Sequence, residues 1–331
     1  MTERLSIAEA ETLASDALQR ASTGPSQAAS VARGLVAAEA AGQSGHGLRR
    51  LVAYCAQATA RKVAGAAVPQ AERTRSALLR IDAGNGFAFP ALDLAVEQLP
   101  AIVRETGVAS AAIHRSHHAG VLGLTVERFA EVGLVALMMA NSPGAMAPWG
   151  GTRALFGTNP VAFAAPLGDR EPIVIDLSLS KIARGKVMAA KQKGISIPAG
   201  WALDHAGQPT TDPDAALAGT MLPMGDAKGA ALALVVEMLS AGLTGANYAY
   251  EASSLFDDKG PPPGLGQWIL VIDPVAMGGD HAVERLAALV GEISAESGTR
   301  IPGRKGRAAR REALETGIAV DDDLLAAIRA I

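Results

Sequence analysis

Residues 108–140, VASAAIHRSHHAGVLGLTVERFAEVGLVALMMA, decide the fold class. The apolar run 108–114 predicts a strand, the spacing of apolar residues over 124–131 predicts a helix, and 134–140 predicts a second, buried strand. The polar loop RSHHAG follows the first strand. Strands that alternate with helices in this way are typical of an α/β or α+β protein.

The segments on both sides continue this alternation. Ser6 is the expected cap of a first helix, and Ser26 is the expected cap of a second helix that ends at residue 40. The other expected elements are strands at 79–83, 161–165, 172–177 and 267–273, helices at 92–105, 182–193, 227–243 and 281–294, and a turn-rich surface loop at 198–213.

Composition and charge exclude several classes of protein. The chain has 331 residues, 49% hydrophobic, which is enough for one large domain or two to three smaller ones. Thirty basic residues against 33 acidic ones give no overall attraction to nucleic acids or anionic membranes. The single cysteine, Cys55, rules out an intrachain disulfide and a cysteine-based zinc site. With no targeting segment and no apolar run long enough for a bilayer, we expect a cytoplasmic protein without membrane or nucleic-acid partners.

Several common catalytic motifs are missing from the sequence. There is no H-E-x-x-H, no G-x-S-x-G and no Walker A box, which argues against a zinc protease, a nucleophilic hydrolase and a P-loop enzyme. The glycines nearest to a dinucleotide fingerprint, Gly264 and Gly266, precede a predicted strand instead of following one. A nucleotide would therefore need a different backbone arrangement.

The segment 44–51, SGHGLRRL, combines an imidazole with two guanidinium groups. Glycines on both sides of His46 let backbone and ligand approach closely. Arg50 follows four residues later, so on a helix the two side chains could face one cavity, where a guanidinium suits a carboxylate. The alternative is a helix start with a capping histidine and solvated arginines.

The loop 116–120, SHHAG, places two histidines at the end of a predicted strand. Such a histidine can exchange protons near neutral pH. A metal site is disfavoured because neighbouring side chains in a strand point to opposite faces and no acidic residue is close by. A buried structural histidine is the alternative.

Four further segments carry polar groups among glycines. The stretch 141–160 can form a pocket wall with donors from Thr158 and Asn159, and the serines and cations after Asp176 suit a ribose and a pyrophosphate at a helix start. GDAKG at 225–229 opens a long apolar helix, and RIPGRKGR at 300–307 is a local anion site. Turn clusters and solvated charged faces use the same residues.

Taken together, these segments resemble the malate/L-lactate dehydrogenase family, whose members lack a Rossmann fold. The most specific matches are S-x-H-x-G at 116–120, APWGG…LFGTNP, IDLSLSKIARGK and LPMGDAKGAALALVVE. NGFAFPAL at 85–92 and LTGANYAYE at 243–251 are most similar to the branch of Δ1-piperideine-2-carboxylate/Δ1-pyrroline-2-carboxylate reductases. The family also contains ureidoglycolate and sulfolactate members.

The resemblance implies a malate/L-lactate dehydrogenase-like fold, with a non-Rossmann mixed sheet and a discontinuous helical domain. We expect residues 1–75 with 275–331 to form the helical domain, and 76–274 to form the cofactor- and substrate-binding α/β domain. A smaller subdomain around 120–165 could divide the latter. The resemblance also implies a homodimer.

The resemblance assigns roles to individual residues. His46 would belong to the proton relay, with His118 as the second candidate for the proton donor, Arg50 would hold the substrate carboxylate, and Thr158 would contact the substrate. Residues that would line the cofactor are His118, Ala119, Gly120, Val121, Leu122, Gly123, Asp176, Leu177, Ser178, Arg184, Gly185, Lys228, Arg300, Pro302, Gly303, Arg304, Lys305 and Gly306.

Two positions depart from the family pattern. The family usually reads S-H-G where this chain has Gly45-His46-Gly47, so Ser44, one residue earlier, is the nearest substitute for the relay serine. Lys186 stands where the piperideine reductase pattern has a catalytic aspartate, although other family members carry lysine there.

The implied activity is hydride transfer between NADPH or NADH and C2 of a small 2-imino or 2-oxo carboxylate, with no metal. A cyclic ketimine substrate is favoured, and a malate/L-lactate-type 2-hydroxy acid dehydrogenase is the alternative. A catalytically silent dinucleotide-binding homologue, and a metal enzyme using His114, His117 and His118, are two further hypotheses.

Overall fold

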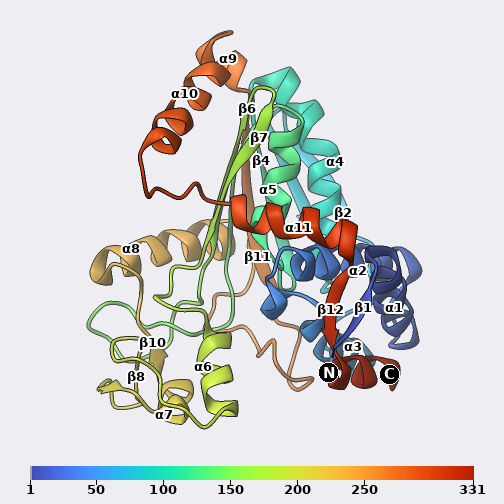
Figure 1. The fold of residues 1–331 in the computed structure, drawn as a ribbon, viewed down its shortest axis with the longest axis vertical. Helices are drawn as coiled ribbons and strands as arrows, with labels where there is room; N and C mark the ends of the chain where they lie inside the picture. Colours follow the sequence, from blue (N-terminus) through green and yellow to red (C-terminus); the bar gives the residue numbers. More distant parts are fainter. Residues whose placement is uncertain (1) are drawn as a thin grey trace.

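The centre of the molecule is a seven-stranded mixed sheet, seen in a computed structural model that describes residues 2–331 (Figure 1). In spatial order its strands are β2 (Gln70–Arg75), β3 (Leu78–Asp82), β4 (Val108–Ser116), β11 (Leu265–Ile272), β5 (Val135–Ala140), β6 (Val161–Leu167) and β7 (Arg170–Leu177). Only the β3–β4 pair is parallel. The expected mixed α/β (α+β) class is thereby confirmed.

Helices cover both faces of this sheet. On one face, α4 (Ala88–Thr106) and α5 (Leu122–Glu131) bury side chains such as Leu99 and Phe129 against the strands. On the other face lies α8 (Asp226–Glu237), whose Val236 packs with Met139 of β5. Helix α8 continues as one π-helical turn, η3 (Met238–Gly242), where the sequence predicted an uninterrupted α-helix. The loop that follows β4 lies at the sheet end nearest the helical layer.

A helical layer joins the two ends of the chain (Figure 1). It contains α1 (Ile7–Arg20), α2 (Pro25–Ala40), α3 (Leu51–Thr59), α11 (Arg304–Thr316), α12 (Asp322–Arg329) and the ribbon of β1 (Thr2–Leu5) with β12 (Ile318–Asp321). Ser6 caps α1 as predicted, in a reciprocal pair with Glu9. The predicted Ser26 cap is wrong: α2 begins at Pro25, because a proline at the first helical position sacrifices no hydrogen bond.

Residues 178–223 form a small unit beside the sheet. It contains α6 (Arg184–Gln192), α7 (Pro213–Ala218) and a three-stranded sheet of β8 (Ala202–Leu203), β9 (Pro209–Thr210) and β10 (Thr220–Met221). The expected loop at 198–213 is therefore wrong in part. Strands of two residues are too short for an alternating apolar pattern to reveal them.

Two helices follow β11 before the chain returns to the helical layer. Helices α9 (Pro274–Gly278) and α10 (Ala282–Ala295) lie at the far end of the sheet, and α10 packs Ala287 and Val290 against Leu167 of β6 (Figure 1). They thus contact the sheet, although the sequence division places them in the segment 275–331. Across residues 2–331, no helix is both long and apolar enough to cross a bilayer.

Candidate active site

Two histidines from distant segments meet beside the helical layer. His46 ends the short helix η1 (Ser44–His46), and His118 lies in the loop after β4. His46 Nδ1 is 3.1 Å from His118 Nε2, and the two rings are stacked with centroids 5.1 Å apart. On the other side, the Tyr54 hydroxyl of α3 is 2.6 Å from His118 Nδ1. The three side chains therefore form one chain of hydrogen bonds.

Burial sets the protonation of this chain. It raises the pKa of Tyr54 well above its usual range, so the phenol keeps its proton. Burial, reinforced by the charge of Arg50, lowers the pKa of His46 to about 4 and holds the pKa of His118 well below its usual range. Both imidazoles are therefore neutral at pH 7. A phenol that donates to His118 Nδ1 leaves the ring proton on Nε2, which donates to His46 Nδ1, and His46 Nε2 then carries an N–H.

Arg50 ends the neighbouring short helix, η2 (Leu48–Arg50). Its Nε donates to the carbonyl of Gly45 at 2.9 Å, and its guanidinium lies 4.7 Å from the ring centroid of Phe256. No residue in the described part of the chain accepts from its two terminal nitrogens. These parallel donors fit a carboxylate. Arg49, by contrast, is paired with Asp321.

The residues behind the histidines are themselves fixed. His117 Nε2 lies 2.9 Å from Oε1 of the fully buried Gln57, and Gln267 donates to the His117 carbonyl. His114 instead faces Asp82 at 4.0 Å. The three histidines of the metal hypothesis thus have different neighbours. Within residues 2–331, no three or more His, Cys, Asp or Glu side chains are grouped so that they could hold a metal ion.

A buried carboxylate organises the loop that carries Thr158. Glu237, at the end of α8, is 3% exposed and accepts from the backbone N–H groups of Gly157 and Ala249 and from the amides of Asn141 and Asn159. The backbone N–H of Thr158 donates to Ser142 Oγ. Sequence reasoning missed this role of Glu237. The sequence feature that could have indicated this role is the single charged residue inside the apolar run 229–240.

Three of the segments predicted to line a cofactor converge. Asp176, near the end of β7, accepts from the N–H of Gly123 at 2.7 Å, and a Cβ at residue 123 would lie 3.0 Å from Asp176 Cβ. Gly303 packs on the same strand, where a Cβ would lie 2.7 Å from the carbonyl oxygen of Val174. The start of α5, the end of β7 and the segment 300–306 are therefore neighbours.

The remaining predicted residues lie in more open surroundings. Arg184 donates to the carbonyl of Leu217, and Ser178 contacts Ser180. No hydrogen bond joins Ser44 to either imidazole in the described chain. The exposed predicted cations, none with a carboxylate partner in residues 2–331, are Lys186, Lys228, Arg300, Arg304 and Lys305. Gly185, Pro302 and Gly303 are exposed as well.

Part of the basic C-terminal segment is neutralised by carboxylates. Arg307 makes two hydrogen bonds to the buried Glu127, and Arg310 also pairs with Glu127. Arg311 pairs with Glu171 at the surface. Cations available to a phosphate are therefore the earlier ones in the run, Arg300, Arg304 and Lys305.

A family model described as malate/L-lactate dehydrogenase matches residues 5–329. The chain belongs to the malate/L-lactate dehydrogenase family. Like the family, it is an NAD(P)-dependent oxidoreductase, so the family, fold and enzyme class inferred from the motifs are confirmed.

The similarity to individual members of the malate/L-lactate dehydrogenase family extends over almost the whole chain. It is 50% identical over 329 residues, 98% of both chains, to a (2R)-3-sulfolactate dehydrogenase (NADP(+)) of Chromohalobacter salexigens. It is 39% identical to a Δ1-pyrroline-2-carboxylate/Δ1-piperideine-2-carboxylate reductase of Pseudomonas putida, over 99% of this chain and 96% of that protein. The crystal structure of Δ1-piperideine-2-carboxylate reductase from Pseudomonas syringae pv. tomato superimposes with a TM-score of 0.94 at 38% identity, over 99% of both chains.

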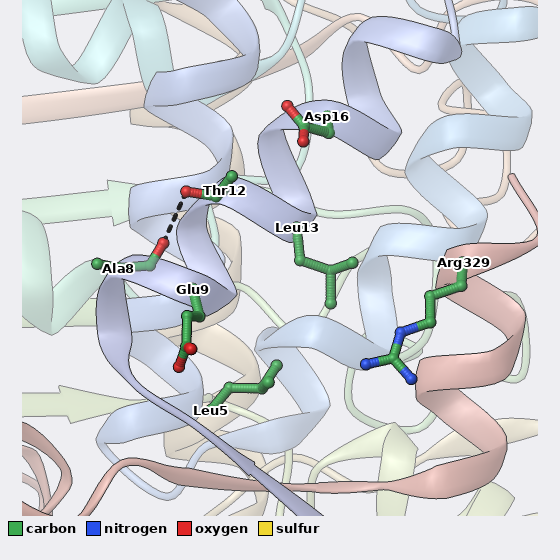
Figure 2. A pocket seen from close by; sticks show the side chains of 7 residues that line it. All are labelled: Leu5, Ala8, Glu9, Thr12, Leu13, Asp16 and Arg329. Carbon is green, nitrogen blue, oxygen red and sulfur yellow. Dashed lines mark hydrogen bonds between the residues drawn. The ribbon is translucent and has the colours of Figure 1, made fainter.

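A surface hollow of about 450 Å³ lies away from these groups, between α1 and α12 of this family member (Figure 2). Three of its polar side chains already have partners: Glu9 accepts from Ser6, Thr12 donates to the Ala8 carbonyl, and Arg329 pairs with Glu3. None of its lining residues was predicted to bind a ligand. A second hollow, of about 350 Å³, is lined in part by residues 147–152 of the predicted pocket wall.

Proposed function

We propose that this enzyme transfers a hydride between NADP(H) and C2 of a small 2-hydroxy/2-oxo acid that carries a second anionic group, with 3-sulfolactate as the model substrate. The observation that carries the proposal is the pairing of a neutral two-histidine relay, His46 and His118, with the unoccupied donor edge of Arg50. The 50% identity to a named sulfolactate dehydrogenase supports this substrate class.

The side chains divide the work of the reaction. Arg50 binds and orients the carboxylate through its two terminal nitrogens. His46 Nε2 donates a proton to the oxygen that develops charge when C2 is reduced, and His46 Nδ1 takes a proton from His118 Nε2. In the oxidative direction the same transfers run backwards. Thr158, fixed through Ser142, is the proposed further contact to the substrate.

The residues present fit a dinucleotide phosphate. Four exposed cations, Lys228, Arg300, Arg304 and Lys305, have no carboxylate partner among residues 2–331 and are available to phosphate oxygens. The other proposed cofactor residues are 118–123, 176–178, 184–185, 302–303 and 306. When bound, the nicotinamide supplies or accepts the hydride. NADP(H) is preferred in the proposal because an extra phosphate gains most from unpaired cations.

Cyclic ketimine reduction is the second candidate. It is favoured by the 39% identity and by the TM-score of 0.94 to named reductases. A protonated cyclic imine brings its own proton, which suits neutral imidazoles such as His46 and His118. Against it stands Lys186, which replaces the aspartate of the piperideine reductase pattern and adds a positive charge that favours a dianion.

An oxidation screen with NADPH and NADH tests both candidates. It would compare 3-sulfopyruvate, oxaloacetate, pyruvate and 2-oxoglutarate with Δ1-piperideine-2-carboxylate and Δ1-pyrroline-2-carboxylate. We expect the highest kcat/KM with 3-sulfopyruvate, and a shift toward the cyclic imines in Lys186→Asp. A higher kcat/KM for an imine in the wild type would establish the second candidate. Binding of NADPH without turnover of any acid would establish a silent homologue.

Arg50→Ala is the matched test of substrate binding. It should raise the KM of the acid by about 100-fold, because a paired carboxylate–guanidinium contact is lost, and leave the Kd of NADPH nearly unchanged. An equal loss of both would contradict the assigned role.

We also propose a homodimer in the cytoplasm. Five apolar side chains of α8 and its continuation are more than a third exposed: Leu232, Leu234, Val235, Met238 and Leu243. Such a cluster is typical of a surface covered by another copy. Light scattering of the purified protein tests it, with Met238→Lys as the variant that should yield monomers. The proposed domain division is a helical unit of α1, α2, α3, α11, α12 and the β1–β12 ribbon, beside an α/β unit built on the seven-stranded sheet.

A further inference from the structure

The side chain of Lys62, just after α3, is 1% exposed. Its ammonium group donates to the carbonyls of Ser254 at 2.6 Å and Asp257 at 3.0 Å, and it lies 3.3 Å from Asp257 Oδ1. A buried ammonium is costly unless acceptors surround it. Here all the acceptors belong to one segment, 254–257, which Lys62 therefore ties to the helical layer.

A second buried side chain holds the same segment. Gln57 is fully buried; its Nε2 donates to the Asp257 carbonyl at 3.0 Å, while its Oε1 lies 2.9 Å from His117 Nε2. Leu255, inside the segment, is 5% exposed. The segment is thus fixed at both ends and in its middle.

Phe256 is the exception in this segment, with 44% of its surface exposed. Its ring covers the Arg50 guanidinium, 4.7 Å from the ring centroid. With Nε bonded to the Gly45 carbonyl and one face against the ring, the guanidinium has its orientation restricted. Only the edge with the two terminal nitrogens stays available.

We propose that Phe256 is a positioning residue for substrate binding, and that Lys62 is the anchor that holds Phe256 against Arg50. The proposal rests on the proposed function, in which Arg50 binds the substrate carboxylate. Lys62 and Phe256 act on the acid through Arg50 and take no part in proton or hydride transfer.

Variants of Phe256 test the ring. Phe256→Ala should raise the KM of the preferred acid about 3- to 30-fold, the range of a cation–π contact, with kcat and the Kd of NADPH changed less than about twofold. Phe256→Tyr should restore a KM close to that of the wild type, while Phe256→Leu should not. A KM unchanged in Phe256→Ala, or restored fully by leucine, would overturn the proposal.

A double-mutant cycle tests the anchor. Lys62→Met should raise KM as Phe256→Ala does, and the double variant should be no worse than the single ones. Lys259→Met, the same change at an exposed position two residues beyond Asp257, is the control and should leave KM unchanged. Multiplicative effects would overturn the anchoring role. If Lys62→Met does not fold, Asp257→Ala replaces it in the cycle. This variant removes the contact between Lys62 and the carboxylate and keeps the contact with the backbone carbonyl.

Failure of this inference differs from failure of the proposed function. If the wild type turns over an acid and Arg50→Ala raises its KM, a silent Phe256→Ala overturns the positioning role alone. If Arg50→Ala leaves KM unchanged, the substrate assignment itself is wrong and the inference falls with it.

Discussion

His46 and His118, 72 residues apart in the sequence, stack with their ring planes at 14° and share a 3.1 Å contact between Nδ1 and Nε2. Two neutral imidazoles joined in this way can pass a proton only if their tautomers agree. The Tyr54 phenol contacts the remaining nitrogen of His118 at 2.6 Å, and by donating its proton there it would fix the tautomer.

Tyr54→Phe tests this arrangement. Loss of one hydrogen bond should free His118 to adopt the other tautomer and lower kcat about tenfold, the equivalent of about 1.4 kcal/mol. KM should stay within about twofold, because Tyr54 does not contact the carboxylate in the proposed arrangement. Steady-state kinetics check this, and an unchanged kcat would show that the phenol does not orient the relay.

The buried histidines make stability depend on pH. The pKa of His46 is lowered from 6.5 to about 4 and that of His117 to about 3, in each case chiefly by burial. Between these values and 6.5 the unfolded chain binds more protons, so the stabilisation is complete above pH 6.5 and is lost as pH falls toward 4. Urea unfolding at pH 7, 6 and 5 should show the free energy of unfolding decrease, for each histidine, by about 0.7 kcal/mol between pH 7 and 6 and by about 1.2 kcal/mol between pH 6 and 5.

A control separates His46 from the rest of the protein. His46→Asn should make the dependence of the unfolding free energy on pH weaker, by the contribution of about one proton taken up on unfolding. An identical slope in the variant would mean that His46 is accessible to protons in the folded state.

Glu237→Gln should destabilise the fold. The carboxylate accepts four hydrogen bonds, and an amide would turn a donor toward two of them, at a cost of about 3 kcal/mol. Urea unfolding measures the loss. Glu251→Gln is the matched control, since Glu251 is exposed and accepts from the N–H of Tyr248 in a loop; we expect a change within about 0.5 kcal/mol. Equal effects would mean that burial does not distinguish the two acids.

Two arginines of α11 each pair with a glutamate, one pair buried and the other exposed, so the same substitution compares the two surroundings. Arg307→Met removes a cation from the buried Glu127 and should cost about 3 kcal/mol of stability. Arg311→Met breaks an exposed pair with Glu171 and should cost about 0.5 kcal/mol. Thermal and urea unfolding provide the measurement, and a larger loss at Arg311 would contradict the role given to Glu127.

The unpaired cations predict cofactor preference. Arg304→Ala should raise the Kd of NADPH about tenfold, through loss of one charge-assisted contact, and leave the Kd of NADH within about twofold. Fluorescence titration of both nucleotides tests this. Arg311→Ala is the control on the same helix, and a parallel loss of NADH affinity would place Arg304 away from the distinguishing phosphate.

Local features of the fold could be predicted from the sequence. The Ser6 cap of α1, the strand at the start of β4 and the helix within α5 depend on neighbouring residues, and the structure has them within a few positions. The pairing of β11 with β4 and β5 could not be predicted, because it joins residues more than a hundred positions apart. Strands β8 and β9 have two residues each and are too short for an alternating apolar pattern to reveal them.

The same division applies to the candidate site. His46 and Arg50 stand in a glycine-rich motif, so their residue types and spacing pointed to chemistry. Lys62 stands in no such motif, and Glu237 ends a family motif that gave it no role. The roles of both depend on acceptors and donors that only folding brings near, such as Asp257, 195 positions from Lys62. Charges buried in this way leave no trace in a local pattern.

The antiparallel ribbon of β1 with β12 has a consequence for biosynthesis. Leu5 shares its apolar core with Ile318, Val320 and Leu325, so β1 lacks these packing partners until β12, about 310 residues later, has been synthesised. The surfaces of α1 that contact α12, and of α2 that contact α11, likewise stay uncovered until those helices have been synthesised. Removing residues 318–331 would thus leave β1 without its partner strand.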